Sequence, residues 1–214
     1  KQPRAAAWTH SYLGPEFSDA EIARYLEEAG AQYETLDDRQ LVERTAHLIS
    51  EQNVVGWFQG RMEFGPRALG GRSIIGDPRS PKMQSVMNLK IKFRESFRPF
   101  APIVLRERAH EYFDIRPDQD SPYMLIVSPV AESVRLETED GRAEGLAKLK
   151  VIRSTVPAVT HVDHSARIQT VSAQTNPRYH RLISLFHELT GVPLLVNAEA
   201  AALFAQAISE YSLW

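Results

Sequence analysis

Apolar residues recur along most of the chain with the spacing of helices or of strands. Helical spacing is clear after a capping box at Ser18, and it is strongest between the cap residue Asn176 and Gly191. A shorter helix is indicated after Ser80-Pro81, with Ser80 as the N-cap and proline at the first position. The predicted helices cover residues 18–29, 38–50, 80–87, 106–113, 177–190 and 199–209.

Short apolar runs bounded by turn residues predict strands between these helices. They lie at 54–58, 103–105, 123–128, 156–162, 167–171 and 192–197. The run 123–128 is apolar on both faces, which predicts a central strand, and 156–162 is expected to pair with 167–171. The polar stretch 132–153 is expected to be a surface excursion. Helices and strands that alternate without an internal repeat predict a mixed α/β fold.

Composition limits the class of protein. The chain has 214 residues, of which 43% are hydrophobic, so it can bury the core of one medium domain. No apolar run is long enough to span a membrane and no signal-peptide pattern opens the chain, so we expect a soluble protein. The chain has no cysteine, which is compatible with the cytoplasm. A pI near 6.4 argues against a dedicated nucleic-acid-binding protein.

Positive charge is concentrated between Arg61 and Arg98. This segment holds nine basic and three acidic residues, whereas the whole chain has a net charge of −2. Such a segment forms either a solvated basic face or a pocket for a small anion. The interleaved glycines favour the pocket, because glycine lets backbone N–H groups approach a ligand. Residues 65–73 have the glycine spacing of a P-loop, but Gly71-Arg72 replaces its Lys-Ser or Lys-Thr ending, so we reject that motif.

Several side chains have competing interpretations. Arg67 and Arg98 could pair with nearby glutamates, but the excess of positive charge favours an anionic ligand. Lys90 and Arg94 are expected to be solvated or to position other residues. Three phenylalanines could stack on bases, but a core position is favoured for them; they are Phe93, Phe97 and Phe100. His161 and His164 are expected to have a structural function rather than to bind a metal.

Four blocks of sequence resemble the C-terminal half of the NodU/CmcH-type O-carbamoyltransferases. They are residues 60–73, 88–102, 160–171 and 189–193, in the order found in that family. The resemblance implies a YrdC-like twisted open sheet with a basic concave face over residues 1–214, of which 1–14 would be a linker from an N-terminal domain. It also implies that this half makes carbamoyl adenylate from carbamoyl phosphate and ATP. An N-terminal half with iron or another metal would then transfer the carbamoyl group to a hydroxyl of a small-molecule acceptor.

The resemblance also implies which residues form the site. It places a carbamoyl-phosphate clamp on Arg67, Lys92, Arg98 and Arg167. Arginine suits this task because its guanidinium group binds phosphate oxygens in pairs, while lysine supplies a point charge. Weaker candidates for substrate or nucleotide contacts are Glu63, Phe64, Gly65, Arg72, Ser73 and His161. Mg²⁺ is expected on the ATP phosphates, but no carboxylate pair indicates a metal site in the protein itself.

Two departures from the family pattern lead to further expectations. After the strand that ends at Asn197, the family has an arginine-bearing loop, whereas this chain runs directly into Ala198-Glu199. Because Ala198 alone would have to reverse the chain, we expect a discontinuity between about Val196 and Ala201. His164 stands where the family has a glycine. Two other functions remain open, namely a nucleic-acid-binding module and a catalytically inactive scaffold.

Overall fold

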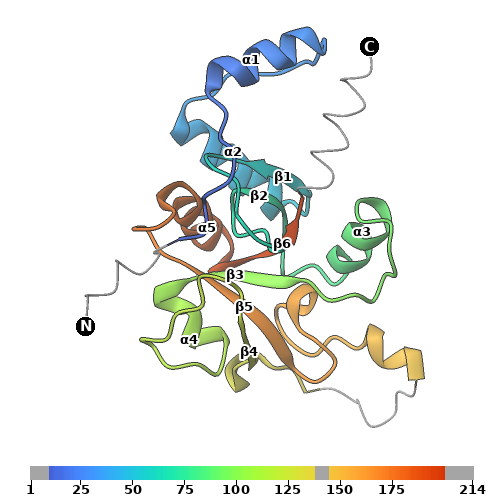
Figure 1. The fold of residues 1–214 in the computed structure, drawn as a ribbon. Coiled ribbons are helices and arrows are strands. Elements are labelled where there is room, and N and C mark those ends of the chain that lie inside the picture. The colour runs from blue at the N-terminus through green and yellow to red at the C-terminus, as the bar shows by residue number, and fades with distance from the viewer. Residues whose placement is uncertain (1–9, 138–144, 201–214) are drawn as a thin grey trace, which may run out of the picture.

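The fold is built on one six-stranded mixed sheet (Figure 1). The computed structural model describes residues 10–137 and 145–200. The strands are β1 (Val55–Phe58), β2 (Arg72–Gly76), β3 (Ala101–Leu105), β4 (Ile126–Pro129), β5 (Ser165–Val171) and β6 (Leu194–Glu199). Their order is β1-β2-β6-β3-β5-β4, in which β3 and β5 are parallel and the other neighbours are antiparallel. The predicted mixed α/β fold is therefore confirmed.

The described residues form five α-helices. They are α1 (Asp19–Glu28), α2 (Asp38–Ser50), α3 (Met83–Lys90), α4 (Ala109–Tyr112) and α5 (Pro177–Thr190). The capping box at Ser18 and the Asn176 cap are both present, and Gly191 ends α5 in the left-handed conformation. Short 3₁₀ segments cover 106–108, 132–134, 145–150 and 157–159. None of the helices in the described ranges is long and apolar enough to cross a membrane.

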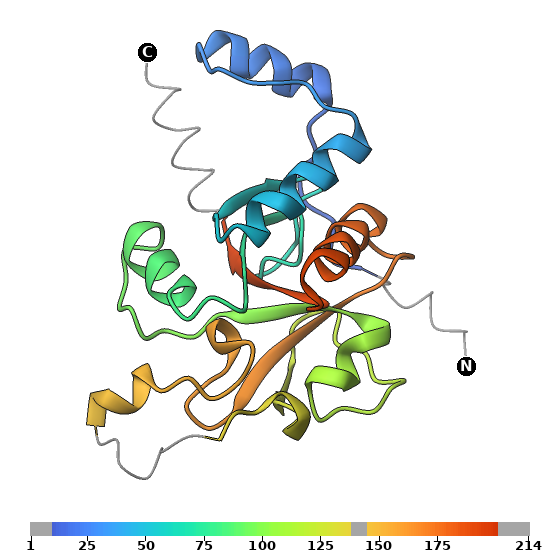
Figure 2. The ribbon, with the colours of Figure 1, turned by 180° about the vertical axis from the view of Figure 1, so that it is seen from behind.

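Part of the core lies between the sheet and the pair α2 and α5. Both views show these two helices side by side next to the sheet (Figures 1 and 2), and α5 contacts β3 and β6. Val42 and Ile49 of α2 meet Leu182 and Phe186 of α5 in one buried cluster. Helix α1 contributes no buried residue and projects away from the sheet (Figure 1). Leu182, Ile183 and Phe186 of α5 are fully buried, whereas Leu189 is 46% exposed and Leu185 is only partly buried.

Two strand predictions are wrong. The run 123–128 was expected to be central, but β4 is an edge strand that pairs only with β5. Two apolar side chains of the run are solvent-exposed, namely Leu125, just before β4, by 78%, and Val127, within β4, by 61%. Residues 157–159 form a 3₁₀ turn instead of a strand, because Pro157 has no N–H to donate to a ladder. The partners of β5 are β3 and β4.

Two helix boundaries also differ from the predictions. Helix α3 begins at Met83 after Lys82, because the Ser80 hydroxyl donates to Gln52 Oε1 at 3.0 Å and does not cap the helix. The predicted helix 106–113 is divided into a 3₁₀ turn and the single turn of α4.

Strand β6 continues past Asn197 without a turn. Residues 196–199 pair in register with 76–73 of β2, and the Ala200 N–H donates to the Arg72 carbonyl at 3.2 Å. The expected discontinuity is therefore wrong over 196–200, because the chain stays extended and needs no reversal at Ala198. Glu199 belongs to the strand, and the rest of the helix predicted over 199–209 lies outside the described residues, apart from Ala200.

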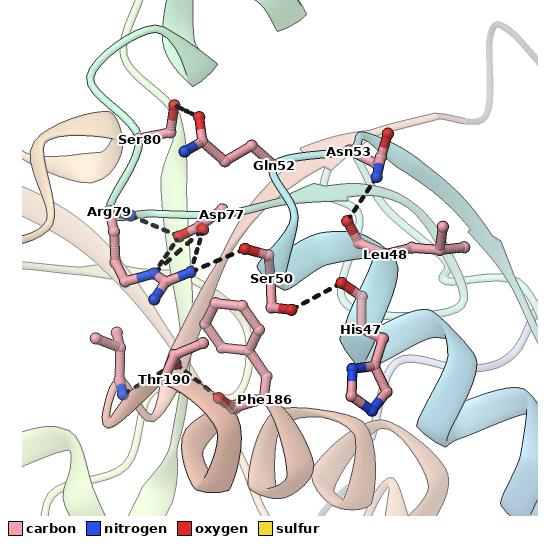
Figure 3. A network of polar contacts seen from close by, with 11 residues as sticks. His47, Leu48, Ser50, Gln52, Asn53, Asp77, Arg79, Ser80, Phe186 and Thr190 are labelled. Carbon is pink, nitrogen blue, oxygen red and sulfur yellow. Dashed lines mark hydrogen bonds and ion pairs between the residues drawn. The ribbon is translucent and has the colours of Figure 1, made fainter.

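One basic residue of the 61–98 segment is occupied by a structural ion pair (Figure 3). Arg79 Nη2 lies 2.6 Å from Asp77 Oδ2 and also donates to the Ser50 carbonyl at the end of α2. Its guanidinium group lies 5.5 Å from the centre of the Phe186 ring. Hydrogen bonding to Asp77, which is 1% exposed, raises the pKa of Arg79. Arg79 therefore joins α2 to α5 and lies apart from the candidate site.

Candidate anion-binding site

The glycine-rich loop before β2 is folded around a buried carboxylate. Glu63 is 5% exposed, and its Oε1 accepts hydrogen bonds from the backbone N–H groups of Leu69 at 2.7 Å, Gly71 at 2.5 Å and Arg72 at 3.3 Å. A charged acceptor with several N–H donors makes strong hydrogen bonds. Glu63 therefore holds the loop in shape from inside.

Gly70 allows this loop to pack against α5. Its φ is +105°, and a Cβ placed there would lie 2.4 Å from Cδ1 of Tyr179, a fully buried residue. The Gly70 N–H donates to Ser73 Oγ at 3.1 Å, so the hydroxyl of the buried Ser73 has a structural partner. Only glycine can adopt this positive φ and also leave room for the Tyr179 ring.

Arg72 is also committed to the loop. Its guanidinium group donates to the carbonyls of Gln59, Gly60 and Gly71 at 2.9, 3.0 and 2.8 Å, and it lies 3.5 Å from the centre of the Phe58 ring. Burial lowers the pKa of Arg72, while the charge of Glu63 opposes this shift. These contacts give Arg72 a structural function, and a nucleotide contact of its side chain stays a prediction.

Phe93 has an unusual backbone conformation, and it lies between two cations that line the same cavity. Phe93 has a φ of +47° and is 81% exposed, while its neighbours Lys92 and Arg94 both line the cavity described next. Arg94 Nε donates to Asn88 Oδ1 at 2.5 Å, and its guanidinium group lies 4.8 Å from the centre of the Phe100 ring. Burial lowers the pKa of Arg94, and Arg98 adds to this effect. Backbone strain of this kind is concentrated at functional sites.

Four basic residues border one small cavity. Arg67, Lys92, Arg94 and Arg167 come from the glycine-rich loop, the segment after α3, and β5, and the cavity between them has a volume of about 250 Å³. A second cavity, of about 240 Å³, shares Pro66, Arg67, Ala68 and Glu199 with the first. The two cavities together are called the basic cavities below.

Among these cations, Arg167 gives the strongest indication of an anionic ligand. Its Nε is buried and has no hydrogen-bond partner within the described part of the chain. Burial lowers the pKa of Arg167, and the nearby charge of Arg67 lowers it further. A buried guanidinium N–H that lacks an acceptor and faces another cation favours an anion between them.

Arg98 lies outside the lining of the cavities. Its side chain is 56% exposed, and its Nε lies 3.8 Å from Glu95 Oε2. The structure thus brings together three of the four predicted clamp residues, adds Arg94, and leaves Arg98 beside Arg94 at the surface. The expected core positions of Phe93 and Phe97 are wrong, because these residues are 81% and 48% exposed; Phe100 is buried.

Two of the remaining predicted contacts border different cavities. Gly65 borders the second cavity with a φ of +139° and open space around it, and Phe64 beside it is 73% exposed. His161 borders a separate cavity of about 750 Å³, where its Nδ1 lies 3.4 Å from Ser165 Oγ. Burial lowers the pKa of His161, although Asp163 opposes the shift.

Sequence reasoning missed two polar residues at the site, Asn197 and Glu199, and did not place a third, Arg94, at the cavity. Asn197 donates to the carbonyl of Ala68 at 2.9 Å and to Gln169 Oε1 at 2.7 Å, which ties β6 and β5 to the glycine-rich loop. Glu199 lines both basic cavities. Its position had no sequence signal, because the alanine-rich pattern after it predicted a helix. Arg94 lies two residues after Lys92, and this spacing could have indicated that both side chains line the same cavity.

The sheet and its basic cavities define a domain suited to bind a small phosphate-like anion. The chain matches the family described as Carbamoyltransferase C-terminus over residues 46–201. The chain therefore belongs to this carbamoyltransferase family.

Relatives from several bacteria match most of the chain. It is 57% identical over 89% of its length to an uncharacterized protein of Synechocystis, of which the match covers 31%. It is 42% identical over 87% of its length to the nodulation protein NolNO of Sinorhizobium fredii, and 36% identical over 78% to nodulation protein U of Rhizobium fredii. The matches cover 25% and 27% of these two relatives. The chain thus spans about a quarter to a third of these relatives.

Proposed function

We propose that this domain activates a carbamoyl group, using carbamoyl phosphate and ATP to form carbamoyl adenylate. The observation that carries the proposal is the convergence of Arg67, Lys92 and Arg167 on one cavity of about 250 Å³. That volume has room for a phosphate-sized group. Membership in the carbamoyltransferase family supports the carbamoyl chemistry.

The proposed reaction has two steps. Water first cleaves carbamoyl phosphate into carbamate and inorganic phosphate. A carbamate oxygen then bonds to the α-phosphorus of ATP, and pyrophosphate leaves. Both steps move negative charge among phosphate oxygens, so fixed cations at the site lower the barriers by positioning and by charge stabilisation.

The basic residues divide this work. Arg67 and Arg167 bind phosphate oxygens as forks, and Lys92 supplies a compact charge. Arg94, which is held by Asn88 and Phe100, contributes positive potential from a fixed position. Arg98 joins the ligand when it releases Glu95, because such an exposed pair contributes only about 0–1 kcal/mol.

The nucleotide is assigned to the second cavity. There the open backbone at Gly65 admits phosphate oxygens, and the exposed ring of Phe64 offers a surface for a base. Glu63, Arg72 and Ser73 hold this loop. No group of three or more potential metal ligands occurs in the described ranges, so Mg²⁺ would be held through ATP phosphates, whose charge it neutralises.

Transfer to the acceptor is assigned elsewhere in the whole protein. The chain spans about a quarter to a third of its relatives, so the pocket for the hydroxyl acceptor and any iron or other metal are placed in the part that it does not match. A chain without cysteine suits the cytoplasm, where we place this chemistry.

Calorimetric titration of the chain with carbamoyl phosphate tests the proposal. Arg167→Ala and Arg167→Lys should each weaken binding at least tenfold, because lysine keeps the charge but loses the fork. The control is Arg39→Ala, which removes a 73% exposed arginine of a surface pair and should leave binding unchanged. Wild-type affinity in the Arg167→Lys variant would contradict the assignment.

One observation favours a second function. Three exposed phenylalanines accompany the basic segment, namely Phe64, Phe93 and Phe97. Aromatic side chains beside positive charge are platforms for single-stranded nucleic acid. The salt dependence of binding separates this function from the binding of a small anion, and an inactive scaffold would bind neither ligand.

A further inference from the structure

Glu199 places a carboxylate among the cations of the site. Its Oε2 lies 3.5 Å from Lys92 Nζ, and its backbone carbonyl accepts from the same Nζ at 2.6 Å. Among the described residues that border the first basic cavity, Glu199 is the one with a carboxylate. It borders the second cavity as well.

The position of Glu199 is set by the sheet. Glu199 pairs with Ser73 of β2, and the next N–H, of Ala200, donates to the Arg72 carbonyl. The shorter contact of Lys92 is with the fixed backbone of Glu199, and the longer one is with its side chain. Removing the carboxylate therefore takes away a charge and leaves the stronger anchor of Lys92 in place.

We propose that the Glu199 carboxylate is an intramolecular counterion that competes with the anionic ligand for Lys92. This inference rests on the proposed anion-binding function. The Lys92 side chain is only 16% exposed, so an incoming anion meets it in a partly desolvated setting where charges interact strongly. The anion must displace the carboxylate or tolerate its repulsion. Because Lys92 lines the first cavity and not the second, Glu199 selects there, at Lys92, against ligands with a higher negative charge.

Titration with inorganic phosphate and with pyrophosphate tests this role. Glu199→Gln keeps the size of the side chain and removes its charge, so it should bind phosphate about tenfold more tightly than the wild type, or about 1.4 kcal/mol. The gain should be larger for pyrophosphate. Glu111→Gln is the matched control, because Glu111 pairs with Arg108 at 3.1 Å outside both cavities and its loss changes the net charge equally. This control should bind phosphate like the wild type.

The outcomes separate the two proposals. If the wild type binds phosphate and Glu199→Gln binds it equally or more weakly, the counterion role is overturned and the anion site stands. If neither protein binds phosphate, the anion site is overturned together with the role of Glu199. Glu199→Ala removes the same charge and must give a gain as well, with thermal unfolding recorded to confirm that each variant is folded.

Discussion

Individual residues in the glycine-rich loop have sharply different tolerance for change. Gly70 and Gly60 both have positive φ values, +105° and +50°, but their surroundings differ. A Cβ at Gly70 would meet the Tyr179 ring at 2.4 Å, whereas a Cβ at Gly60 would meet nothing within 4 Å. Alanine substitutions at the two positions therefore distinguish the cost of backbone strain from the cost of steric overlap.

We expect Gly70→Ala to lower the free energy of unfolding by about 3 kcal/mol, because overpacking a core costs about 1–3 kcal/mol and a left-handed alanine about 1–2 kcal/mol. Gly60→Ala should cost only about 1 kcal/mol, since it carries the second penalty alone. Urea denaturation of both variants measures the difference. Equal losses would mean that Tyr179 yields to the new methyl group.

His161 makes stability depend on pH. Burial lowers its pKa below the ordinary value of 6.5, so near pH 6 the unfolded state binds more protons than the folded state. The His161 contribution is complete above pH 6.5 and is lost as the pH falls through the lower pKa of the folded state. His161→Gln should therefore flatten the decline in unfolding free energy that begins as the pH falls below about 6.5. The same slope in both proteins would contradict a partly buried, neutral imidazole in the folded state.

At the scale of elements, α2, the β2–α3 connection and α5 meet at the Asp77–Arg79 pair (Figure 3). Asp77 is 1% exposed and accepts from both the backbone and the guanidinium group of Arg79. Exposed pairs such as Arg39–Glu43 lack this burial. The contribution of the pair to stability therefore depends on its surroundings as well as on its charges.

We expect Asp77→Ala to lower the free energy of unfolding by about 3 kcal/mol, because it leaves the partly buried Arg79 cation without its carboxylate. Glu43→Ala removes a carboxylate from an exposed pair and should change stability by less than about 0.5 kcal/mol. Denaturant titration measures both variants. A small effect of Asp77→Ala would show that Ser50 and solvent are sufficient partners for Arg79.

Elements with strong local signals could be predicted from the sequence, and those defined by pairing could not. The Ser18 capping box and the Asn176 cap mark α1 and α5 by contacts within a few residues. By contrast, β4 lies at an edge although its sequence is apolar on both faces, because strand order depends on distant partners. Glu199 continues β6 because β2 pairs with it, against a local pattern that favours a helix.

The same distinction applies to the site. The charge excess between 61 and 98 indicated an anion pocket. The family resemblance named four clamp residues, of which Arg67, Lys92 and Arg167 line one cavity and Arg98 does not. Local sequence could not reveal that Arg72 and Arg79 are used inside the fold, because their partners are backbone carbonyls and a carboxylate fixed by folding. It also could not bring Glu199 to Lys92, which is 107 positions away in the chain.

At the scale of the whole molecule, the segregation of charge separates a small-anion site from a nucleic-acid surface. The net charge is −2, and the cations at the site gather around cavities of about 250 and 240 Å³. A ligand held there meets a few fixed cations at short range. A polynucleotide would need a longer basic track, and the rest of this acidic chain would repel it.

We therefore expect carbamoyl phosphate binding to weaken by less than about tenfold between 50 and 200 mM salt, because partly buried charges at short range are screened less than exposed ones. Polynucleotide binding through six to ten phosphate contacts would fall by about 10³–10⁵ over the same range. Titrations of carbamoyl phosphate and of a single-stranded oligonucleotide, each at several salt concentrations, measure both slopes. Tight oligonucleotide binding with the steep slope, together with no response to carbamoyl phosphate, would assign the basic cavities and the exposed phenylalanines to nucleic acid.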